Sequence, residues 1–390
     1  MPLPTMATLP EEDQMIVSQV RRFVEREVIP VASELEHNDQ YPHELVRKMK
    51  EMGLFGVAVP PEYGGLGLSL VTYAAIVEEI SRGWMSLGGI INGTVILSWM
   101  IKTYGTQDQK ERFLPRMATG EIHCGICMTE PNAGSDLQSI QTVARRDGDF
   151  YVLNGTKMYV SNGIYGHLFA VLTKTDPQAQ PPHRGMSTFL VEKASTTGLT
   201  VGGQIQKLGY KGIDTTIFYF EEARVPAANL LGGEEGQGWL HIMSGIEVGR
   251  INVAARAVGV ATAALEDAIR YAKQRIAFGR PIAEHQAIQL KLADMATKVE
   301  AARLLTRAAA AKKDAGERAD LWGGMAKLFA SEVAQEVALE ALRIHGGIGY
   351  TKDMRVERYY RDTPLMLIGE GTNEIQRLVI ARNILRMFGE

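Results

Sequence analysis

The sequence has little cysteine. Its two cysteines, Cys124 and Cys127, form a C-x-x-C, a spacing used by redox pairs and by half-sites for zinc. No second pair or nearby histidine cluster completes a tetrahedral zinc site. The surrounding IHCGICM is typical of a strand, where a spacing of three sends two side chains to opposite faces. We therefore expect two small buried residues, with a redox pair as the alternative.

The sequence also lacks a strong net charge and a long apolar run. Its net charge is −3, so nothing favours nucleic acid as a partner. No uninterrupted apolar run approaches the ~20 residues that span a bilayer. The start, MPLPTMATLP, lacks the basic and apolar segments of a secretory signal. We expect a cytoplasmic protein, and the 390 residues suit two or three globular domains.

Several nucleotide and hydrolase motifs are missing. No G-x-G-x-x-G stands between a strand and a helix, and the glycines of GGEEGQG (232–238) have the wrong spacing. The chain has no G-x-x-x-x-G-K-[ST], H-E-x-x-H or G-x-S-x-G. Rossmann dinucleotide binding, P-loop, zinc-peptidase and serine-hydrolase functions lose their usual support. A flavin bound outside a Rossmann fold stays open.

Residues 1–122 have the pattern of helices. Pro42 suits the first turn of a helix whose apolar residues Leu45, Met49 and Met52 share one face. Ser69 is placed to cap a helix that runs to Ile80, and Thr106 to cap Gln107 to Met117. The stretch 59–67 is a loop by composition.

Residues 123–232 change to short β-branched and aromatic runs between turn signals. Asp147-Gly148 and Asn154-Gly155 each predict a turn before a strand. Further strands are expected at 167–173, 186–192 and 215–225. This region is predicted to be a mainly antiparallel β domain.

Residues 233–390 return to the helical period. Candidate helices are 239–273, 283–314, 319–345 and 373–387, which suit a four-helix bundle. One of them has a single apolar seam formed by Ile288, Leu292, Met295, Val299, Ala302 and Thr306. The fold class is therefore α+β, in the order helices, sheet, helices.

Two β-domain segments carry groups that suit a polar ligand. Met128 to Asp136 is a strand that enters a flexible turn, in which the Thr129 and Ser135 hydroxyls can bind a heterocycle edge. Alternation along Lys157 to Gly163 places Tyr159 and Ser161 on one face. A tight turn and a half-buried strand face are the structural alternatives.

These segments resemble the acyl-CoA dehydrogenase family. The shared patterns are T-E-P-x-A-G-S-D, N-G-x-K-x-x-[ILV]-[ST]-N-G, Arg275-x-x-Phe-Gly279, Glu284-His-Gln286, Gly346-Gly347-x-Gly349 and Glu370-Gly-Thr-x-Glu-Ile-Gln376. The resemblance covers essentially the whole chain. It implies a helical domain, a β domain and a four-helix bundle, with FAD, an acyl-CoA substrate and a homotetramer or dimer. An electron-transferring flavoprotein is the implied electron acceptor.

The resemblance also implies which residues bind FAD, partly across a subunit interface. They are Ile126, Met128, Thr129, Gly134, Ser135, Tyr159, Ser161, Arg275, Phe278, His285, Gln286, Arg343, Gly346, Gly347, Thr372 and Glu374. Thr372 or Asn373 can cap a helix whose N–H groups favour a phosphate. Ala277 and Arg343 depart from the family's frequent Thr and Gln, and Tyr159 from its Trp.

Glu370 is the expected general base. Abstraction of the α-hydrogen of a thioester needs a carboxylate whose pKa is raised, to about 6–7, by an apolar pocket. Gly369 and Gly371 permit close backbone approach. A carboxylate that complements a helix dipole is the alternative. Gly249 occupies the position of an alternative base in some relatives. The substrate-binding residues implied by the resemblance are Ser135, Glu247, Arg250, Arg318 and Gly371.

The acyl group is expected to be short to medium. Asn92 and Trp99, in the helix around 88–99, indicate a shorter or partly polar cavity. The absence of Arg near Met85 argues against glutaryl-CoA. A flavin oxidase of the same superfamily and a non-catalytic binding partner in an assembly are the alternatives.

Overall fold

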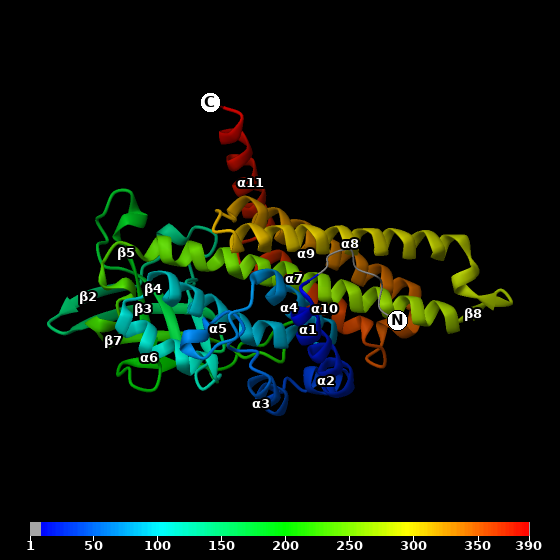
Figure 1. Cartoon of the computed structure of the whole chain (residues 1–390), viewed down its shortest axis with the longest axis horizontal. Coiled ribbons are helices and arrows are strands. Elements are labelled where there is room, and N and C mark those ends of the chain that lie inside the picture. The colour runs from blue at the N-terminus through cyan, green and yellow to red at the C-terminus, as the bar shows by residue number, and fades with distance from the viewer. Residues whose placement is uncertain (1–8, 390) are drawn as a thin grey trace.

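The N-terminal region is helical. The computed structural model describes residues 9–389, and Figure 1 shows the sheet at one end of the molecule, with the long bundle helices extending to the opposite end and the N-terminal helices beside them. The region contains α1 (Glu11–Phe23), a π-helical turn (Val24–Val28), α2 (Ile29–His37), α3 (His43–Glu51), α4 (Leu70–Gly83), α5 (Met85–Tyr104) and α6 (Gln107–Ala118). The order helices, sheet, helices is confirmed.

Two of the three predicted helix starts are confirmed by hydrogen bonds of the capping side chains, and the third is shifted by one residue. The Ser69 hydroxyl accepts from the Thr72 N–H at 3.1 Å. Thr106 and Gln109 form a capping box at the start of α6. Pro42 is the N-cap of α3, one position before the first turn in which we placed it. The fixed φ of proline suits either position.

Seven strands form one curved sheet. They are β1 (Cys124–Cys127), β2 (Val143–Asp147), β3 (Phe150–Ser161), β4 (Leu168–Lys174), β5 (Met186–Glu192), β6 (Leu199–Val201) and β7 (Thr215–Pro226). Their order is β1-β4-β2-β3-β7-β6, with β5 also on β4. Pairing is antiparallel except where β4 meets β1 and β2. The mainly antiparallel prediction is confirmed.

The turn predicted at Asn154-Gly155 is wrong. β3 runs straight through it, and β7 carries an extra residue opposite, with Glu222 in the left-handed region. Gly155 has a φ of +149°, and a Cβ there would lie 2.4 Å from the Thr142 hydroxyl oxygen. The glycine therefore marks a bulge and a close approach, which asparagine–glycine composition does not distinguish from a turn.

The C-x-x-C is structural. Both thiols are free and buried. Cys124 packs with the apolar residues of α5 and α6, whereas Cys127 packs with those of β3 and β7, so the opposite-face prediction is confirmed. Burial raises the pKa of the Cys124 thiol to about 12 and also raises that of Cys127. Residues 9–389 contain no group of three His, Cys, Asp or Glu side chains that could hold a metal.

The C-terminal region is a helical bundle. It comprises α7 (Gly238–Gln274), the β8–β9 hairpin (Ile276–Ala277 and Arg280–Pro281), α8 (Gln286–Asp314), α9 (Asp320–His345), α10 (Val356–Ile368) and α11 (Asn373–Met387). The seam of α8 lies against the core as predicted.

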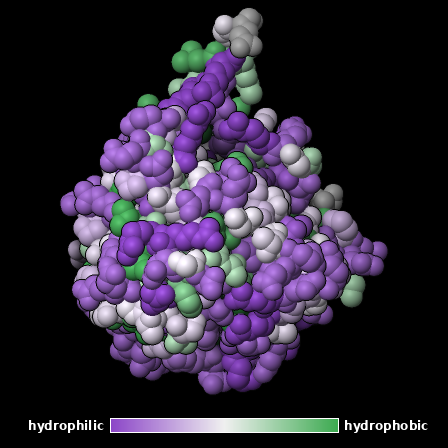
Figure 2. Space-filling model, turned by 90° about the vertical axis from the view of Figure 1, so that its left-hand side faces the viewer, coloured by the Kyte–Doolittle hydropathy of each residue, from purple (hydrophilic) through white to green (hydrophobic). Residues whose placement is uncertain are grey.

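The prediction of the four bundle helices is wrong in one helix, because it omitted α10. α10 packs on α7 and α9 as the fourth helix, and its internal Pro364 obscured the helical pattern. The predicted fourth helix, α11, instead contacts α9 and projects from the body (Figure 1). Figure 2, a view onto the β-domain end, shows a mainly hydrophilic surface with α11 rising above it.

Two core helices are apolar along most of their length. α5 and α7 are long and apolar enough to cross a membrane, but both are mostly buried inside the protein. α7 packs against α4 and α5 on one side and α8 to α10 on the other. It therefore connects the N-terminal helices to the bundle.

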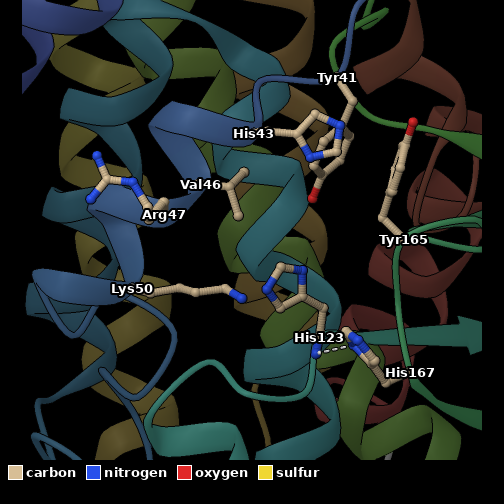
Figure 3. Close-up of a pocket in the computed structure, with 8 residues that line it drawn as sticks. All are labelled: Tyr41, His43, Val46, Arg47, Lys50, His123, Tyr165 and His167. Carbon is tan, nitrogen blue, oxygen red and sulfur yellow. Dashed lines mark hydrogen bonds between the residues drawn. The ribbon is translucent and has the colours of Figure 1, made fainter.

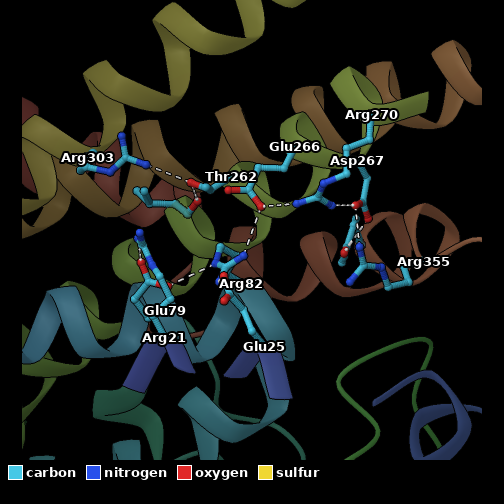
Figure 4. Close-up of polar contacts among 12 residues, drawn as sticks. Arg21, Glu25, Glu79, Arg82, Thr262, Glu266, Asp267, Arg270, Arg303 and Arg355 are labelled. Atoms are coloured by element: carbon cyan, nitrogen blue, oxygen red, sulfur yellow. Dashed lines mark hydrogen bonds and ion pairs between the residues drawn. The ribbon is translucent and has the colours of Figure 1, made fainter. Parts of the chain in front are cut away.

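Ion pairs lock these helices together (Figure 4). Arg82 of α4, a buried residue, contacts Glu25 at 2.9 Å, and Glu79 and Glu266 at 3.2 Å each. Asp267 of α7 meets Arg355, before α10, at 2.6 Å. A buried pair costs more to break than an exposed one. The positions of α4, α7 and α10 are thus fixed relative to one another.

Candidate functional site

Glu370 lies in a strained turn between α10 and α11. Its φ is +57°, and that of Gly371 is +85°. A non-glycine residue in the left-handed region costs of order 1–3 kcal/mol and persists where its surroundings fix it. The position therefore needs an explanation in the contacts around it.

A buried lysine supplies the main fixation. Lys327 of α9 is fully buried, and its ammonium donates to the Leu367 carbonyl at 3.1 Å, the Gly371 carbonyl at 2.9 Å and the Asn373 side-chain oxygen at 2.8 Å. Burial lowers the pKa of Lys327 to about 8. The Gln376 amide also donates to the Gly371 carbonyl, at 3.0 Å. The turn is held from both sides.

The Glu370 carboxylate points at α5 and α7. The Asn92 amide donates to it at 3.2 Å. A Cβ at Gly249 would lie 2.7 Å from one carboxylate oxygen, so only glycine leaves room there. Burial raises the pKa of Glu370, opposed by the Arg256 charge, the Asn92 hydrogen bond, and the Arg250 and Lys327 charges. A raised pKa in a partly accessible carboxylate is what a general base requires.

Polar atoms around this carboxylate lack partners. Within residues 9–389, the buried atoms without a hydrogen bond include Asn92 Oδ1, Arg250 Nε, Arg256 Nε, Asn252 Oδ1 and Gln376 Oε1. Buried polar groups nearly always have a partner, from protein, water or ligand. Their concentration here indicates a place that receives a polar molecule.

Behind Asn92 the space between α5 and α7 is closed. Arg256 donates to the Tyr210 hydroxyl at 2.8 Å. A Cβ at Gly89 would lie 1.5 Å from that hydroxyl, and one at Gly88 would lie 3.1 Å from Arg256 Cγ. Only glycine at both positions leaves room for the Tyr210 and Arg256 side chains.

The other predicted substrate residues differ in their surroundings. Arg250 is buried, and burial lowers its pKa while Glu370 opposes that change. Glu247 is paired with Lys313 at 2.5 Å. Arg318 is largely exposed and pairs with Asp320 at 3.1 Å. Arg250 and Gly371 thus adjoin Glu370, whereas Glu247 and Arg318 lie along α7 and at the start of α9.

The predicted flavin-ring residues gather on the β domain. The turn after β1 is fastened by Glu130, which accepts from Lys157 at 2.7 Å and from the Thr142 N–H at 3.0 Å. Tyr159 has a φ of +58° and sits in a bulge, so simple alternation does not extend to it. It is 58% exposed. Ile126, Met128, Thr129 and Ser161 are half-buried, and Gly134 and Ser135 are exposed.

The predicted pyrophosphate and adenosine residues gather at the far end of the bundle. Arg275, Gln286, Arg343, Gly346 and Gly347 are exposed, and Phe278 is 97% exposed. The His285 ring lies 3.1 Å from the Ala277 carbonyl oxygen. Tyr271 and His345 stack with ring centroids 4.4 Å apart, which brings the ends of α7 and α9 together.

One chain does not bring these two groups together. Figure 1 places the β8 hairpin and the β domain at opposite ends of the molecule. Thr372, the N-cap of α11, and the exposed Glu374 lie at the Glu370 turn. The donor chemistry fits FAD: hydroxyls and an aromatic side chain for a ring, and arginines with histidine and glutamine for phosphates. The separation agrees with the predicted binding across a subunit interface.

The sequence interpretation missed two residues of this site. Lys327 stands in GGMAKLFAS, where a lone lysine in an apolar helix was the available signal. Arg256, in NVAARAVGVA, is a charge in an equally apolar stretch. Charged residues are rarely buried without a partner.

Comparison with known proteins agrees with this arrangement. Residues 10–121, 125–223 and 236–385 match the families described as acyl-CoA dehydrogenase N-terminal, middle and C-terminal domains. An acyl-CoA dehydrogenase of Bacillus subtilis is 44% identical over 376 residues, covering 96% of this chain and 98% of that protein. The mitochondrial short-chain specific enzyme of Rattus norvegicus is 42% identical, over 97% and 92%. The structure of butyryl-CoA dehydrogenase from Megasphaera elsdenii has a TM-score of 0.94 and 36% identity, over 97% and 99%.

Proposed function

The chain belongs to the acyl-CoA dehydrogenase family, whose members are FAD-dependent oxidoreductases, and from that premise we propose that it converts a short acyl-CoA to the 2-enoyl-CoA with Glu370 as general base. The observation that carries the proposal is the Glu370 turn. A strained backbone, a buried lysine and a raised pKa all serve one carboxylate.

The proposed roles follow from the contacts. Glu370 removes the α-proton of the thioester, and Asn92 orients the carboxylate. We propose that a backbone N–H near Glu370 donates to the thioester oxygen, on which negative charge develops. Bound FAD supplies the acceptor for the β-hydrogen as hydride. Arg250, buried beside Glu370, is positioned for the polar part of the substrate.

The preference for a short acyl chain rests on the closed space behind Asn92. Arg256 and Tyr210 fill the region between α5 and α7, against Gly88 and Gly89. A long alkyl chain would have to displace a buried guanidinium. The short-chain relative of Rattus norvegicus supports the same choice.

Arg256 favours a second candidate, an acyl chain with a polar or carboxylate end. It is buried, and it makes no ion pair with a carboxylate within residues 9–389. Its one hydrogen bond goes to a neutral tyrosine. The Glu370 carboxylate is the charge on which Arg256 already acts, and a carboxylate at the end of the acyl chain would add a second one. The absence of Arg at Met85 does not exclude this route, because Arg256 approaches from α7.

The wider context completes the proposal. The separation of the two groups of proposed FAD-binding residues supports a homodimer or homotetramer. An electron-transferring flavoprotein as acceptor and a cytoplasmic location are further parts of the proposal. A flavin oxidase would instead consume oxygen on turnover. A non-catalytic role has no use for the fixed Glu370 carboxylate.

The test is anaerobic mixing of the FAD-loaded protein with butyryl-CoA, octanoyl-CoA and succinyl-type dicarboxylyl-CoA, followed by flavin absorbance. We expect bleaching with butyryl-CoA, slower by about 10²–10⁴-fold in Glu370→Gln. Glu336→Gln, an exposed α9 residue paired with Lys298, is the control and keeps the rate. Bleaching that is equal in Glu370→Gln would refute the base, and faster bleaching with the dicarboxylyl-CoA would establish the second candidate.

A further inference from the structure

A cavity lies where the N-terminal helices meet the β domain. Its volume is about 230 Å³. Tyr41, His43 and Lys50 line it from α3 and the residues before it. His123 lines it from just before β1, and Tyr165 and His167 from just before β4 (Figure 3). None of its lining residues belongs to the set around Glu370. None of them is acidic.

The donors that face this cavity have no partners. His123 is 4% exposed, and its ring faces the Gly120 backbone without a well-formed hydrogen bond from either ring nitrogen within residues 9–389. The buried Tyr41 hydroxyl is also unpaired there. In Figure 3 the Lys50 ammonium points toward the His123 ring, and the described part of the chain gives Lys50 no ion pair. These three donors converge from separate elements.

Neighbouring charges have partners of their own. Arg47, at the rim, pairs with Glu44 at 3.0 Å and Glu51 at 2.5 Å. Glu121, near His167, pairs with Arg116 at 2.7 Å. Asp214, whose charge acts on Tyr41, accepts from the Ile164 N–H at 2.6 Å through one carboxylate oxygen. Lys50 is thus the cation left for an incoming group.

Aromatic rings form the rest of the wall. Tyr41 and Tyr165 lie with centroids 4.2 Å apart, and His43 meets Tyr165 edge-on at 5.0 Å. His123 stacks on Phe55 at 4.5 Å, which holds its ring edge toward the cavity. Flat rings favour a flat apolar body. The volume is below the roughly 300–1,000 Å³ of drug-sized ligand sites, so the occupant is small.

We propose that this cavity binds a small planar organic carboxylate, with its carboxylate at Lys50, His123 and Tyr41 and its body against Tyr165. Charge-assisted hydrogen bonds hold the anionic end, and ring contacts select the body. Binding is separate from the dehydrogenase reaction and does not depend on it.

The experiment uses the full-length holoprotein with ¹⁵N-labelled histidine and the probe 4-fluorobenzoate. We expect saturable ¹⁹F binding at one site per chain, with shifts of the His123 and His167 imidazole nitrogens. Lys50→Met should weaken binding roughly ten- to hundred-fold, because one charged hydrogen-bond donor is lost. Lys48→Met is the matched control on the same helix, since Lys48 pairs with Glu27, and should keep the affinity.

A second variant tests the same site at a different residue, in case Lys50→Met does not fold. Tyr165→Leu, at a residue 39% exposed, should weaken 4-fluorobenzoate while leaving inorganic phosphate unaffected. No saturable binding, or equal affinity in wild type and Lys50→Met, overturns the proposal. Phosphate binding as tightly as 4-fluorobenzoate overturns the planar body, because the site would then take any oxyanion.

Discussion

The turn that holds Glu370 and the hairpin around Phe278 are built in opposite ways. At Glu370, buried donors from α5, α9 and α11 converge on a few backbone and carboxylate atoms. At the hairpin, arginines and a phenylalanine project into solvent, and Phe278 is 97% exposed. The Glu370 turn is therefore fixed by contacts within one chain, whereas the hairpin presents exposed residues that, under the proposed function, would meet FAD and a second subunit.

The two regions differ in when their stabilising interactions form. The Glu370 turn holds backbone strain against hydrogen bonds that already exist. The hairpin leaves apolar area exposed, which becomes favourable only when it is buried, at about 25 cal/mol per Å². Changes at the first region should act on every isolated chain, and changes at the second should act only on the assembled, cofactor-loaded protein.

The largest effect should come from Lys327→Met. The side chain keeps its volume, but the Leu367 carbonyl and the Asn373 side-chain oxygen lose the ammonium donor, and the Gly371 carbonyl keeps the Gln376 amide. Unsatisfied buried groups cost about 1–3 kcal/mol each, and displacement of Glu370 by an ångström costs about 100-fold in rate. Denaturant unfolding measures the loss of stability, and the rate of flavin bleaching measures the loss of activity. Unchanged bleaching would show that Glu370 is fixed without this lysine.

Gly249→Ala should be next. The new Cβ would lie 2.7 Å from the Glu370 carboxylate, so the carboxylate must move, and we expect about a 10- to 100-fold slower bleaching rate with little loss of stability. Gly323→Ala is the matched control, because its Cβ would have its nearest neighbour at 3.8 Å. Equal rates in the two variants would place the reacting carboxylate elsewhere.

Asn92→Leu should shift the pH profile. Burial raises the pKa of Glu370 and the Asn92 hydrogen bond lowers it, so removal of the amide raises that pKa further. The base must be ionised, and the rate in the variant should fall on the acidic side and recover as pH rises. Stopped-flow bleaching across pH checks this. A profile that moves toward lower pH contradicts the assigned contact.

Phe278→Ala should have the smallest effect on the chain itself. An exposed side chain contributes little to folding, so the free energy of unfolding of apoprotein should change by less than about 0.5 kcal/mol. The protein should retain less FAD, and its oligomer distribution should shift toward the monomer. Both can be followed by gel filtration with absorbance. A large loss of apoprotein stability would show that the hairpin packs within its own chain.

Local signals in the sequence predicted much of the fold. Ser69 and Thr106 fixed two helix starts through a single hydroxyl each, and a spacing of three placed the cysteines on opposite faces. α10 was missed because Pro364 contradicts helix locally while packing on α7 and α9 overrides it. The Asn154-Gly155 error has the same origin, since only the partner strand reveals a bulge.

The site was predictable where its residues are contiguous. Glu370 stands within one motif, whereas Gly249 was noted only through the resemblance, as the position of an alternative base. Lys327 and Arg256 reach the site through tertiary packing, so no spacing rule identifies them. The only signal for them in the sequence is a charged residue inside an apolar helix. This signal predicts that the charge has a partner, but it does not identify the partner.

The buried cysteine pair of β1 has a practical consequence. Both native thiols are buried, and burial raises the pKa of each, so thiol reagents such as maleimides should react with them slowly. A cysteine introduced at Phe278 would be the sole reactive thiol of each chain. A single spin label or dye there would report how many copies meet at the hairpin, and at what separation, without any prior cysteine removal.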